Sequence, residues 1–428
     1  MNNDSDVIER ARRVFTPALH IYYPISAVRG EGVFVFADDG KRYMDFSSGL
    51  GVLNIGHNHP RVKEAAGKQM ENLIHTGGIY YNETTVLAAE KLLAVAPEGI
   101  DMLFFSNSGA EAVEGALKLA RHVTGRQGII SFTHAFHGRT LGAVSVTTSS
   151  AAYRKRYHPL LPSVYQAPYP YCYRCRFGKR PDTCGLSCLD YLEEILTYQI
   201  PAHEVAMVII EPFLGEGGYF PAPSSFLVAL RELCDRHGIL LVFDEVQSGM
   251  GRTGRWFAGE HAGVVPDIMT VAKGIASGFP LSAVAAGKGL MELWPSGAHG
   301  TTFGGNPVSC AACVATIDVI RDEGLLEKSS VRGATIMERL RPFASAHPLV
   351  GQVRGYGYMI GIEFVTYEGA PNGAACAQVL DYCLGKGLIL IGCGMERNVI
   401  RFIPPLVSTE KELEQALSIL EEGIARLA

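Results

Sequence analysis

The stretch Leu240-Leu-Val-Phe-Asp-Glu-Val-Gln-Ser-Gly249 decides how this chain folds, and Thr270-Val-Ala-Lys-Gly274 follows it. Each stretch begins as a short apolar run and ends in a polar residue, Asp244 in the first and Lys273 in the second. Short apolar runs of this kind are typical of strands buried in a parallel sheet, whose ends lie at one edge. We therefore expect a carboxylate and an amine, 29 positions apart in the sequence, at the same edge of a sheet.

A fixed carboxylate beside a reactive lysine is the arrangement that pyridoxal phosphate (PLP) chemistry requires. Lys273 is expected to hold the cofactor as a Schiff base, and Asp244 to keep the pyridine nitrogen protonated so that the ring accepts electrons. The alternative for Lys273 is a solvated lysine at a strand end, the usual place of lysines. A carboxylate that ends an apolar strand is costly without a defined partner. The pair together therefore favours the functional interpretation.

The composition is that of an ordinary globular enzyme. The chain has 428 residues, 47% hydrophobic and 19% charged, enough for a large core and a second lobe. A formal net charge of -5 argues against nucleic acid or an acidic membrane surface as a partner. The apolar runs are strand-sized, the N-terminus is polar and acidic, and most of the ten cysteines are scattered. We therefore expect a cytoplasmic protein without a membrane span.

Strand-like and helical patterns alternate over most of the chain, which predicts an α/β fold with a mostly parallel sheet covered on both faces. Predicted helices such as Glu111–His122 and Phe226–His237 separate the strands. The predicted strands of this sheet are Met102–Ser106, Gly128–Phe132, Gly142–Thr147, Val205–Glu211, Leu240–Glu245, Ile268–Ala272 and Ser282–Gly287. We expect a large PLP-binding domain at 61–305 with an insertion at 166–190. A smaller α+β domain at 320–428 would be completed by residues 1–60, which contain a predicted hairpin.

Further motifs are suited to binding a phosphate, an aromatic ring and a carboxylate. Ser108-Gly-Ala110 leads from a strand into a helix, where backbone N–H groups bind phosphate; the alternative is an ordinary N-capping serine. Phe136 follows a strand and can lie flat on a cofactor ring, or it is a core aromatic. Arg139 and Arg401 can each bind a substrate carboxylate in a bidentate manner, or they are solvated surface groups.

Taken in order, these motifs resemble the class III aminotransferases, PLP enzymes of fold type I, along nearly the whole chain. Any one of the matching stretches is weak by itself, but in this order, with Asp244 and Lys273 correctly placed, they are specific. The matching stretches are Asp45–His57, Asn107–Ala112, Phe136–Thr140, Glu211–Gly218, Asp244–Gly254, Ala272–Gly274 and Thr301–Pro307.

The resemblance implies a role for each site residue. Lys273 would carry the cofactor and shuttle a proton, and Asp244 would pair with the pyridine nitrogen. Phe136 would stack on the ring and Gln247 would contact its phenolic oxygen. The residues expected to bind the cofactor are Ser108, Gly109, Ala110, Phe136, His137, Glu211, Asp244, Val246, Gln247 and Lys273. Thr302 would reach the phosphate of a neighbouring subunit, which implies a homodimer with its active sites at the interface.

The resemblance also indicates a substrate class. Arg401 matches a family arginine that binds an α-carboxylate, and Glu216 matches a glutamate that covers this arginine. Arg139 matches an arginine that binds the distal carboxylate, and Leu50 is expected to lie beside the substrate. This set implies transfer of an amino group from an ω-amino acid such as 4-aminobutyrate to 2-oxoglutarate or pyruvate, in two half-reactions through the pyridoxamine form. The alternatives are a Glu216–Arg401 ion pair without a switching role and a PLP-dependent racemase or epimerase with nearly the same motifs.

Four cysteines lie close together in the expected insertion, at Cys172, Cys175, Cys184 and Cys188. Their spacing, Cys-x2-Cys-x8-Cys-x3-Cys, suits a tetrahedral structural zinc, and the alternative is reduced thiols or a cysteine pair. A non-enzymatic scaffold that binds zinc and a protein partner here is the remaining hypothesis. The presence of Lys273 and Asp244 argues against that scaffold, and no metal is expected in the reaction itself.

Overall fold

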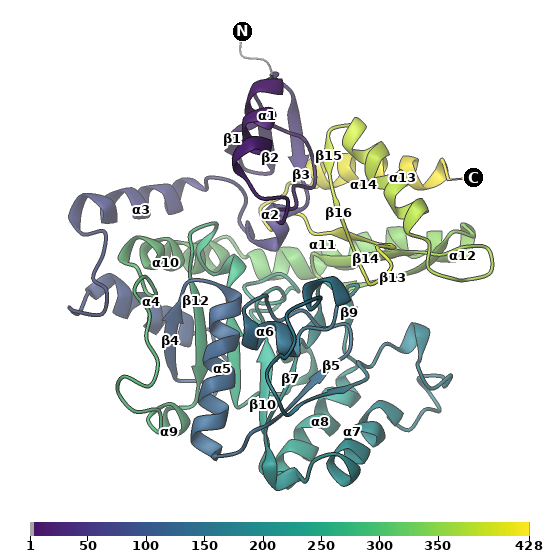
Figure 1. Ribbon diagram of the computed structural model, residues 1–428. Coiled ribbons are helices and arrows are strands. Elements are labelled where there is room, and N and C mark those ends of the chain that lie inside the picture. The colour runs from purple at the N-terminus through teal and green to yellow at the C-terminus, as the bar shows by residue number, and fades with distance from the viewer. Residues whose placement is uncertain (1–3, 428) are drawn as a thin grey trace.

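A computed structural model describes residues 4–427, and its centre is a seven-stranded sheet (Figure 1). In spatial order the strands are β4 (Met102–Ser106), β12 (Ser282–Ala286), β11 (Ile268–Val271), β10 (Leu240–Asp244), β7 (Val205–Ile210), β5 (Gly128–Phe132) and β6 (Val164–Ala167). All of them run parallel except β12, which is antiparallel to both of its neighbours. The mostly parallel sheet predicted from the sequence is therefore confirmed.

Helices surround the sheets, and no helix between residues 4 and 427 is long and apolar enough to cross a membrane. The helices of the described chain are α1 (Asp4–Val14), α2 (Ser48–Gly51), α3 (Pro60–Asn72), α4 (Glu83–Leu93), α5 (Gly109–Thr124), α6 (Leu141–Val146), α7 (Ser187–Tyr198), α8 (Ser224–His237), α9 (Lys288–Met291), α10 (Pro307–Asp322), α11 (Leu325–Leu340), α12 (Phe343–Ala346), α13 (Gly373–Gly385) and α14 (Glu410–Ala425). The cytoplasmic location stays a prediction.

Both faces of the central sheet are covered by helices, as the continuous apolar strands require. Leu241 and Phe243 of β10 pack in one core cluster with residues of α7 and α8. Val242, between them in the strand, packs in another cluster with residues of α5. Because successive side chains of a strand point to opposite faces, a strand that is apolar at every position fits between two helical layers.

Two smaller sheets lie beside the central one. The first consists of β1 (Ala27–Glu31), β2 (Phe34–Ala37), β3 (Arg42–Asp45) and β15 (Leu388–Ile389), and the second of β13 (Val350–Tyr356), β14 (Met359–Phe364), β17 (Val399–Phe402) and β16 (Ile391–Cys393). Leu388 of β15 pairs in parallel with Met44 of β3. The N-terminal hairpin thus joins a C-terminal strand, and in Figure 1 the labelled helices α1 and α14 both lie above the central sheet. The domain boundaries themselves stay a prediction.

One predicted strand is wrong, because Gly142–Thr147 lies almost entirely within helix α6. The Glu114 carboxylate accepts the N–H groups of Gly142 and Ala143 at 2.9 and 3.3 Å, which satisfies donors in the first turn. The Ser145 hydroxyl donates to the Leu141 carbonyl at 2.6 Å. A short buried apolar run does not distinguish a strand from a helix by its pattern. Long-range capping by Glu114 favours the helix here.

We expect Phe243→Ala to lower the free energy of unfolding by about 3–5 kcal/mol, because it removes a buried aromatic side chain and leaves a cavity. Phe243 is 1% exposed and packs in the cluster beneath α8. Val228 on the same helix is 40% exposed, so the control Val228→Ala should change stability by less than about 0.5 kcal/mol. Urea unfolding of the cofactor-free protein measures both. Equal losses would contradict the two-layer core described here.

Candidate active site

A cavity of about 630 Å³ opens where the strands of the central sheet end. Its lining comes from segments that follow β4, β5, β7, β10 and β11, the place where parallel sheets bind ligands. Most of the predicted site residues lie in this lining, namely Ser108, Gly109, Ala110, Phe136, His137, Arg139, Glu211, Glu216, Asp244, Val246, Gln247 and Lys273. The sheet thus brings together residues that are far apart in the sequence.

Asp244 ends β10 as a buried carboxylate that is 3% exposed. Its Oδ1 accepts the Val246 N–H at 3.0 Å and the Thr270 hydroxyl at 3.2 Å. Its Oδ2 lies 2.7 Å from Nδ1 of His137. A buried carboxylate needs such partners to offset its desolvation. These partners fix the carboxylate at one position and orientation in the cavity.

Lys273 follows β11 and lines the same cavity as Asp244. Its backbone φ is 48°, a left-handed conformation that costs a non-glycine residue about 1–2 kcal/mol. Burial lowers the pKa of Lys273 from 10.5 to about 8, and the positive charge of Arg401 acts in the same direction. Near neutral pH the unprotonated fraction of this amine is therefore much larger than that of an ordinary lysine, which favours its use as a nucleophile or a base.

The start of α5, which is the predicted phosphate cradle, lies at the cavity wall. Ser108 is the N-cap, and its hydroxyl accepts the Glu111 N–H at 3.3 Å in a capping box. The N–H groups of the first helical turn, which have no partner within a helix, follow at Gly109 and Ala110. A Cβ added at Gly109 would lie 2.9 Å from Cγ1 of Val246. The serine is thus a helix cap, and it stands at a closely packed helix start whose free N–H groups are suited to an anion.

The predicted aromatic Phe136 lines the cavity, and Glu211 holds its backbone. The Phe136 N–H donates to Glu211 Oε1 at 2.8 Å, and the Gly215 N–H donates to Oε2 at 2.8 Å. Burial, assisted by the charge of Asp244, raises the pKa of Glu211 to about 7. The Arg139 guanidinium lies over the Phe136 ring at 4.9 Å and is exposed.

Glu216 and Arg401 form the ion pair that the sequence suggested. Glu216 lies in the turn of residues 215–219, here named the gate turn, between β8 (Phe213–Leu214) and β9 (Phe220–Pro221). Its Oε2 accepts a hydrogen bond from Nη2 of Arg401, which is 2% exposed. Glu216 lines the cavity, whereas Arg401 is not part of the lining. The glutamate therefore covers the arginine on the cavity side.

Besides Arg401, two predicted residues lie outside the cavity lining. Thr302 lines a second cavity of about 540 Å³, which it shares with Asn107. Leu50 in α2 is 44% exposed, and Val52, at the end of the same short helix, lines the cavity instead. Sequence reasoning missed Thr270, which lies opposite Asp244 in the parallel register of β10 and β11. A hydroxyl opposite a buried carboxylate indicates a hydrogen-bond partner, but it can be recognised only when the register of the two strands is known.

The four clustered cysteines are free thiols that line one small cavity. Desolvation raises the pKa of the Cys188 thiol to about 11, and the other three cysteines act in the same direction. Within the described residues, no group of three or more His, Cys, Asp or Glu side chains is arranged to hold a metal ion. The zinc alternative therefore rests on the sequence spacing alone.

The cavity fits the PLP expected from the sequence. Oε1 of Gln247 and Nε2 of His137 are buried and have no hydrogen-bond partner among the described residues. A Cβ at Gly138 would lie 2.7 Å from Cβ of Ala110, so the backbone there approaches the phosphate cradle closely. A fixed carboxylate, an amine of lowered pKa, a helix start and an aromatic ring face one space, which is the donor set that PLP requires.

Comparisons with known proteins agree with this geometry. The family model for class III aminotransferases matches residues 17–424. A probable 4-aminobutyrate aminotransferase from Bacillus subtilis is 40% identical over 93% of this chain and 92% of its own length. An alanine/serine racemase from Pyrococcus horikoshii is 38% identical over 98% of this chain and 90% of its own length.

Solved structures show the same fold. A Bacillus anthracis aminotransferase superposes with a TM-score of 0.93 and 31% identity, covering 100% of both chains. An amine transaminase from an uncultivated Pseudomonas species, solved with PLP bound, gives a TM-score of 0.90 and 32% identity over 97% of this chain and 99% of its own. The chain therefore belongs to the class III aminotransferases, PLP-dependent transaminases of fold type I.

Proposed function

We propose that this enzyme transfers an amino group from an ω-amino acid, such as 4-aminobutyrate, to 2-oxoglutarate or pyruvate. The observation that carries the proposal is the ion pair between Glu216 and Arg401. Glu216 covers a buried arginine on the side of the cavity. A donor that presents an amine without an adjacent carboxylate fits the covered state, whereas a 2-oxo acid requires the arginine to be free.

Each of the other site residues has a proposed role in the reaction. PLP supplies an electrophilic carbon for the amino group and a ring that accepts electrons. Nζ of Lys273 would take a proton from the donor carbon and deliver it to the reacting carbon of the cofactor in the same half-reaction. Asp244, which is fixed by His137 and Thr270, would pair with the pyridine nitrogen. Phe136 would provide a flat face for the ring, and the start of α5 would bind the phosphate.

Two arginines are the proposed binding partners of the substrate carboxylates. Arg139 is exposed at the cavity wall and is the proposed partner of the carboxylate distal to the reacting amine. Arg401 is the proposed partner of an α-carboxylate once Glu216 moves aside. Planar guanidinium groups bind carboxylates in a bidentate manner, so each arginine fixes orientation as well as charge.

We also propose a homodimer. Thr302 is exposed and lines a second cavity next to the phosphate cradle, with Asn107 in both linings. A residue in this place is free to reach the phosphate site of a second copy of the chain. A symmetric dimer would then complete both active sites at the interface.

A racemase or epimerase is the second candidate, favoured by two relatives of that activity. They are the alanine/serine racemase described above and a leucine/methionine racemase from Thermococcus litoralis, 38% identical over 98% of this chain and 95% of its own length. The same lysine and carboxylate serve both reactions. A requirement for a 2-oxo acid acceptor distinguishes the aminotransferase from the racemase.

We expect Lys273→Ala to lower turnover by about a thousandfold or more, because the variant lacks both the attachment point and the proton carrier. Lys288 at the start of α9 is 63% exposed and offers a matched control. Lys288→Ala should retain the visible spectrum and the activity of the parent enzyme. Steady-state assays and visible spectra measure both variants. Unchanged turnover in Lys273→Ala would overturn the assignment of the lysine.

The attachment of PLP to the cofactor-free enzyme should follow the lowered pKa of Lys273. The unprotonated amine reacts, so its fraction and the attachment rate rise with pH through about 8 and level off above it. The rate is measured from the growth of the visible absorption after mixing. A free lysine derivative, with an ordinary pKa near 10.5, is the control. A rate that still climbs steeply beyond pH 9.5 would contradict this environment for Lys273.

We expect Glu216→Ala to lower the ratio of kcat/KM for 4-aminobutyrate to kcat/KM for an α-amino acid such as glutamate by about tenfold or more. The reason is that Arg401, without the covering Glu216, is always free to bind the α-carboxylate of an amino acid. Glu216→Gln keeps the shape without the charge and should give an intermediate ratio. Equal losses with both donor classes would mean that the pair is structural.

A further inference from the structure

Arg354 of β13 holds the gate turn by its backbone. Nε of Arg354 donates to the Tyr219 carbonyl at 2.9 Å, and Nη2 donates to the Gly218 carbonyl at 2.6 Å. The guanidinium carbon also lies 3.9 Å from the centre of the Phe220 ring. Arg354 is 7% exposed. Because the guanidinium is rigid and planar, two adjacent carbonyls bound to it are fixed together.

Glu363 of β14 is the buried counter-ion of Arg354. Its Oε2 accepts from Nη1 of Arg354 at 2.7 Å and from the Tyr171 hydroxyl at 2.5 Å. Its Oε1 accepts from Nε of Arg174 at 2.8 Å. Burial by itself raises the pKa of Glu363, but Arg354 and these hydrogen bonds hold it below its ordinary value. The carboxylate therefore stays charged at neutral pH and orients the arginine.

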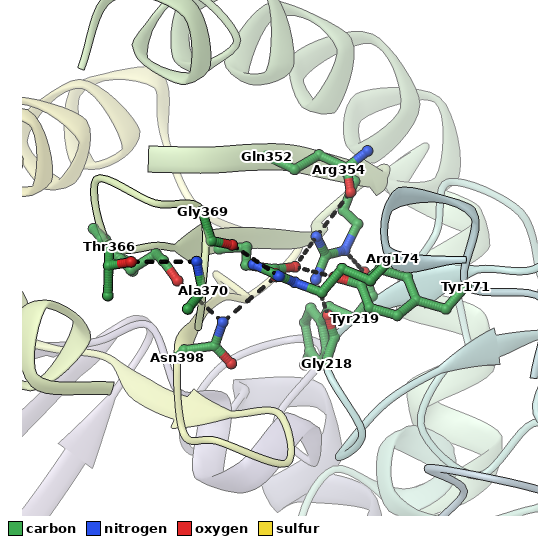
Figure 2. A network of polar contacts seen from close by, with 12 residues as sticks. Tyr171, Arg174, Gly218, Tyr219, Gln352, Arg354, Thr366, Gly369, Ala370 and Asn398 are labelled. Carbon is green, nitrogen blue, oxygen red and sulfur yellow. Dashed lines mark hydrogen bonds and ion pairs between the residues drawn. The ribbon is translucent and has the colours of Figure 1, made fainter. Parts of the chain in front are cut away.

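Residues 166–190, which contain the four clustered cysteines and are here named the cysteine-rich segment, supply two of these contacts. Tyr171 and Arg174 flank Cys172, and Figure 2 shows both side chains in one polar network with Arg354 and the gate turn. The Tyr171 ring stacks on Phe220 with a centroid separation of 3.7 Å. Nη1 of Arg174 donates to the Gly369 carbonyl at 2.9 Å. The network thus joins the gate turn, the cysteine-rich segment and the C-terminal sheet.

Strand β14, which carries Glu363, also positions Arg401, the second residue of the gate. Gly361 of β14 pairs with Arg401 of β17, two residues before Glu363. A Cβ at Gly361 would lie 2.8 Å from Cβ of Tyr219, so the gate turn packs directly on this strand. Tyr219 is held by Arg354 and follows Glu216 by three residues in a tight turn, in which its N–H donates to the Gly215 carbonyl. A shift of the turn would therefore move Glu216 relative to Arg401.

We propose that Arg354 is a positioning residue for the gate formed by Glu216 and Arg401, and that its pairing with Glu363 thereby contributes to the choice between ω-amine donors and α-carboxylate substrates. This inference rests on the proposed function of the gate. Arg354 contacts the backbone of the gate turn and lies outside the cavity lining. Its effect on selectivity must then pass through Glu216.

The first test is Arg354→Lys, which keeps a positive charge near Glu363 but cannot bind two carbonyls and a carboxylate at once. We expect the ratio of kcat/KM for 4-aminobutyrate to kcat/KM for glutamate to fall about 10- to 100-fold, the order found when a reacting arrangement is slightly misplaced. The visible spectrum of the bound cofactor should not change. Arg231 of α8 forms a less buried ion pair with Asp267, away from the gate turn. The control Arg231→Lys should leave the ratio unchanged.

The second test places Arg354→Lys in the Glu216→Ala background. If Arg354 acts through Glu216, its replacement adds no further change of the ratio once the glutamate is gone. A fall of the ratio in the parent background that is absent in the Glu216→Ala background supports the inference. An equal fall in both backgrounds, or an unchanged ratio in Arg354→Lys while Glu216→Ala shifts it, overturns the inference and leaves the proposed function standing.

If Glu216→Ala itself does not shift the ratio, the gate has no switching role and the proposed function fails together with this inference. Where Arg354→Lys does not fold, Tyr171→Phe is the milder variant, since it removes one hydrogen bond from Glu363 and keeps the stack on Phe220. It should lower the ratio in the same direction but by less, with the cofactor spectrum preserved. If the ratio of the two kcat/KM values in Tyr171→Phe equals that of the parent enzyme, the proposed role of the network in selectivity is contradicted.

Discussion

The buried carboxylate of Asp244 is the constraint on which the active site depends. A charged group at the end of an apolar strand requires partners, and each of them comes from a different part of the sheet. Thr270 lies opposite it on β11, Val246 follows it in the chain, and His137 comes from the segment after β5. Strand β11 ends one residue after Thr270, and Lys273 follows two residues later. Holding Asp244 in place therefore aligns the strand that delivers the lysine.

The substrate side of the site depends on a second buried pair, Glu216 and Arg401, and on the lobe behind it. Both gate residues are positioned by β13 and β14. Arg401 pairs with β14, and the turn that carries Glu216 contacts Gly361 of β14 and Arg354 of β13. Removing one partner of a buried charge pair is costly because the other charge is left uncompensated. The residues around an ion pair that must open are therefore best held by a rigid network. The buried Arg354–Glu363 pair forms such a network behind Glu216 and Arg401.

Much of this arrangement could be predicted from the sequence, because a charged residue at the end of a buried apolar strand, like Asp244, or just after it, like Lys273, is costly without a partner or a ligand. The family resemblance supplied the Glu216–Arg401 pair, which no local pattern indicates. Helix α6 was missed because a buried apolar run has the same pattern in a strand and in a helix, and the capping carboxylate of Glu114 lies 28 positions before Gly142. Thr270 and Arg354 were missed because their partners become visible only through strand register and tertiary contact. Val52 lines the cavity in place of Leu50, and the left-handed backbone of Leu50, with a φ of 68° inside the distorted helix α2, is not indicated by the sequence.

The measurement that tests the central claim most directly is the visible spectrum of the PLP-loaded enzyme during one half-reaction. The enzyme is mixed with 4-aminobutyrate and no oxo acid, and 2-oxoglutarate is added afterwards. The account predicts loss of the long-wavelength cofactor band in the first step and its return in the second. A band that does not respond to 4-aminobutyrate, together with loss of optical rotation of an α-amino acid without any acceptor, would contradict the account and identify a racemase.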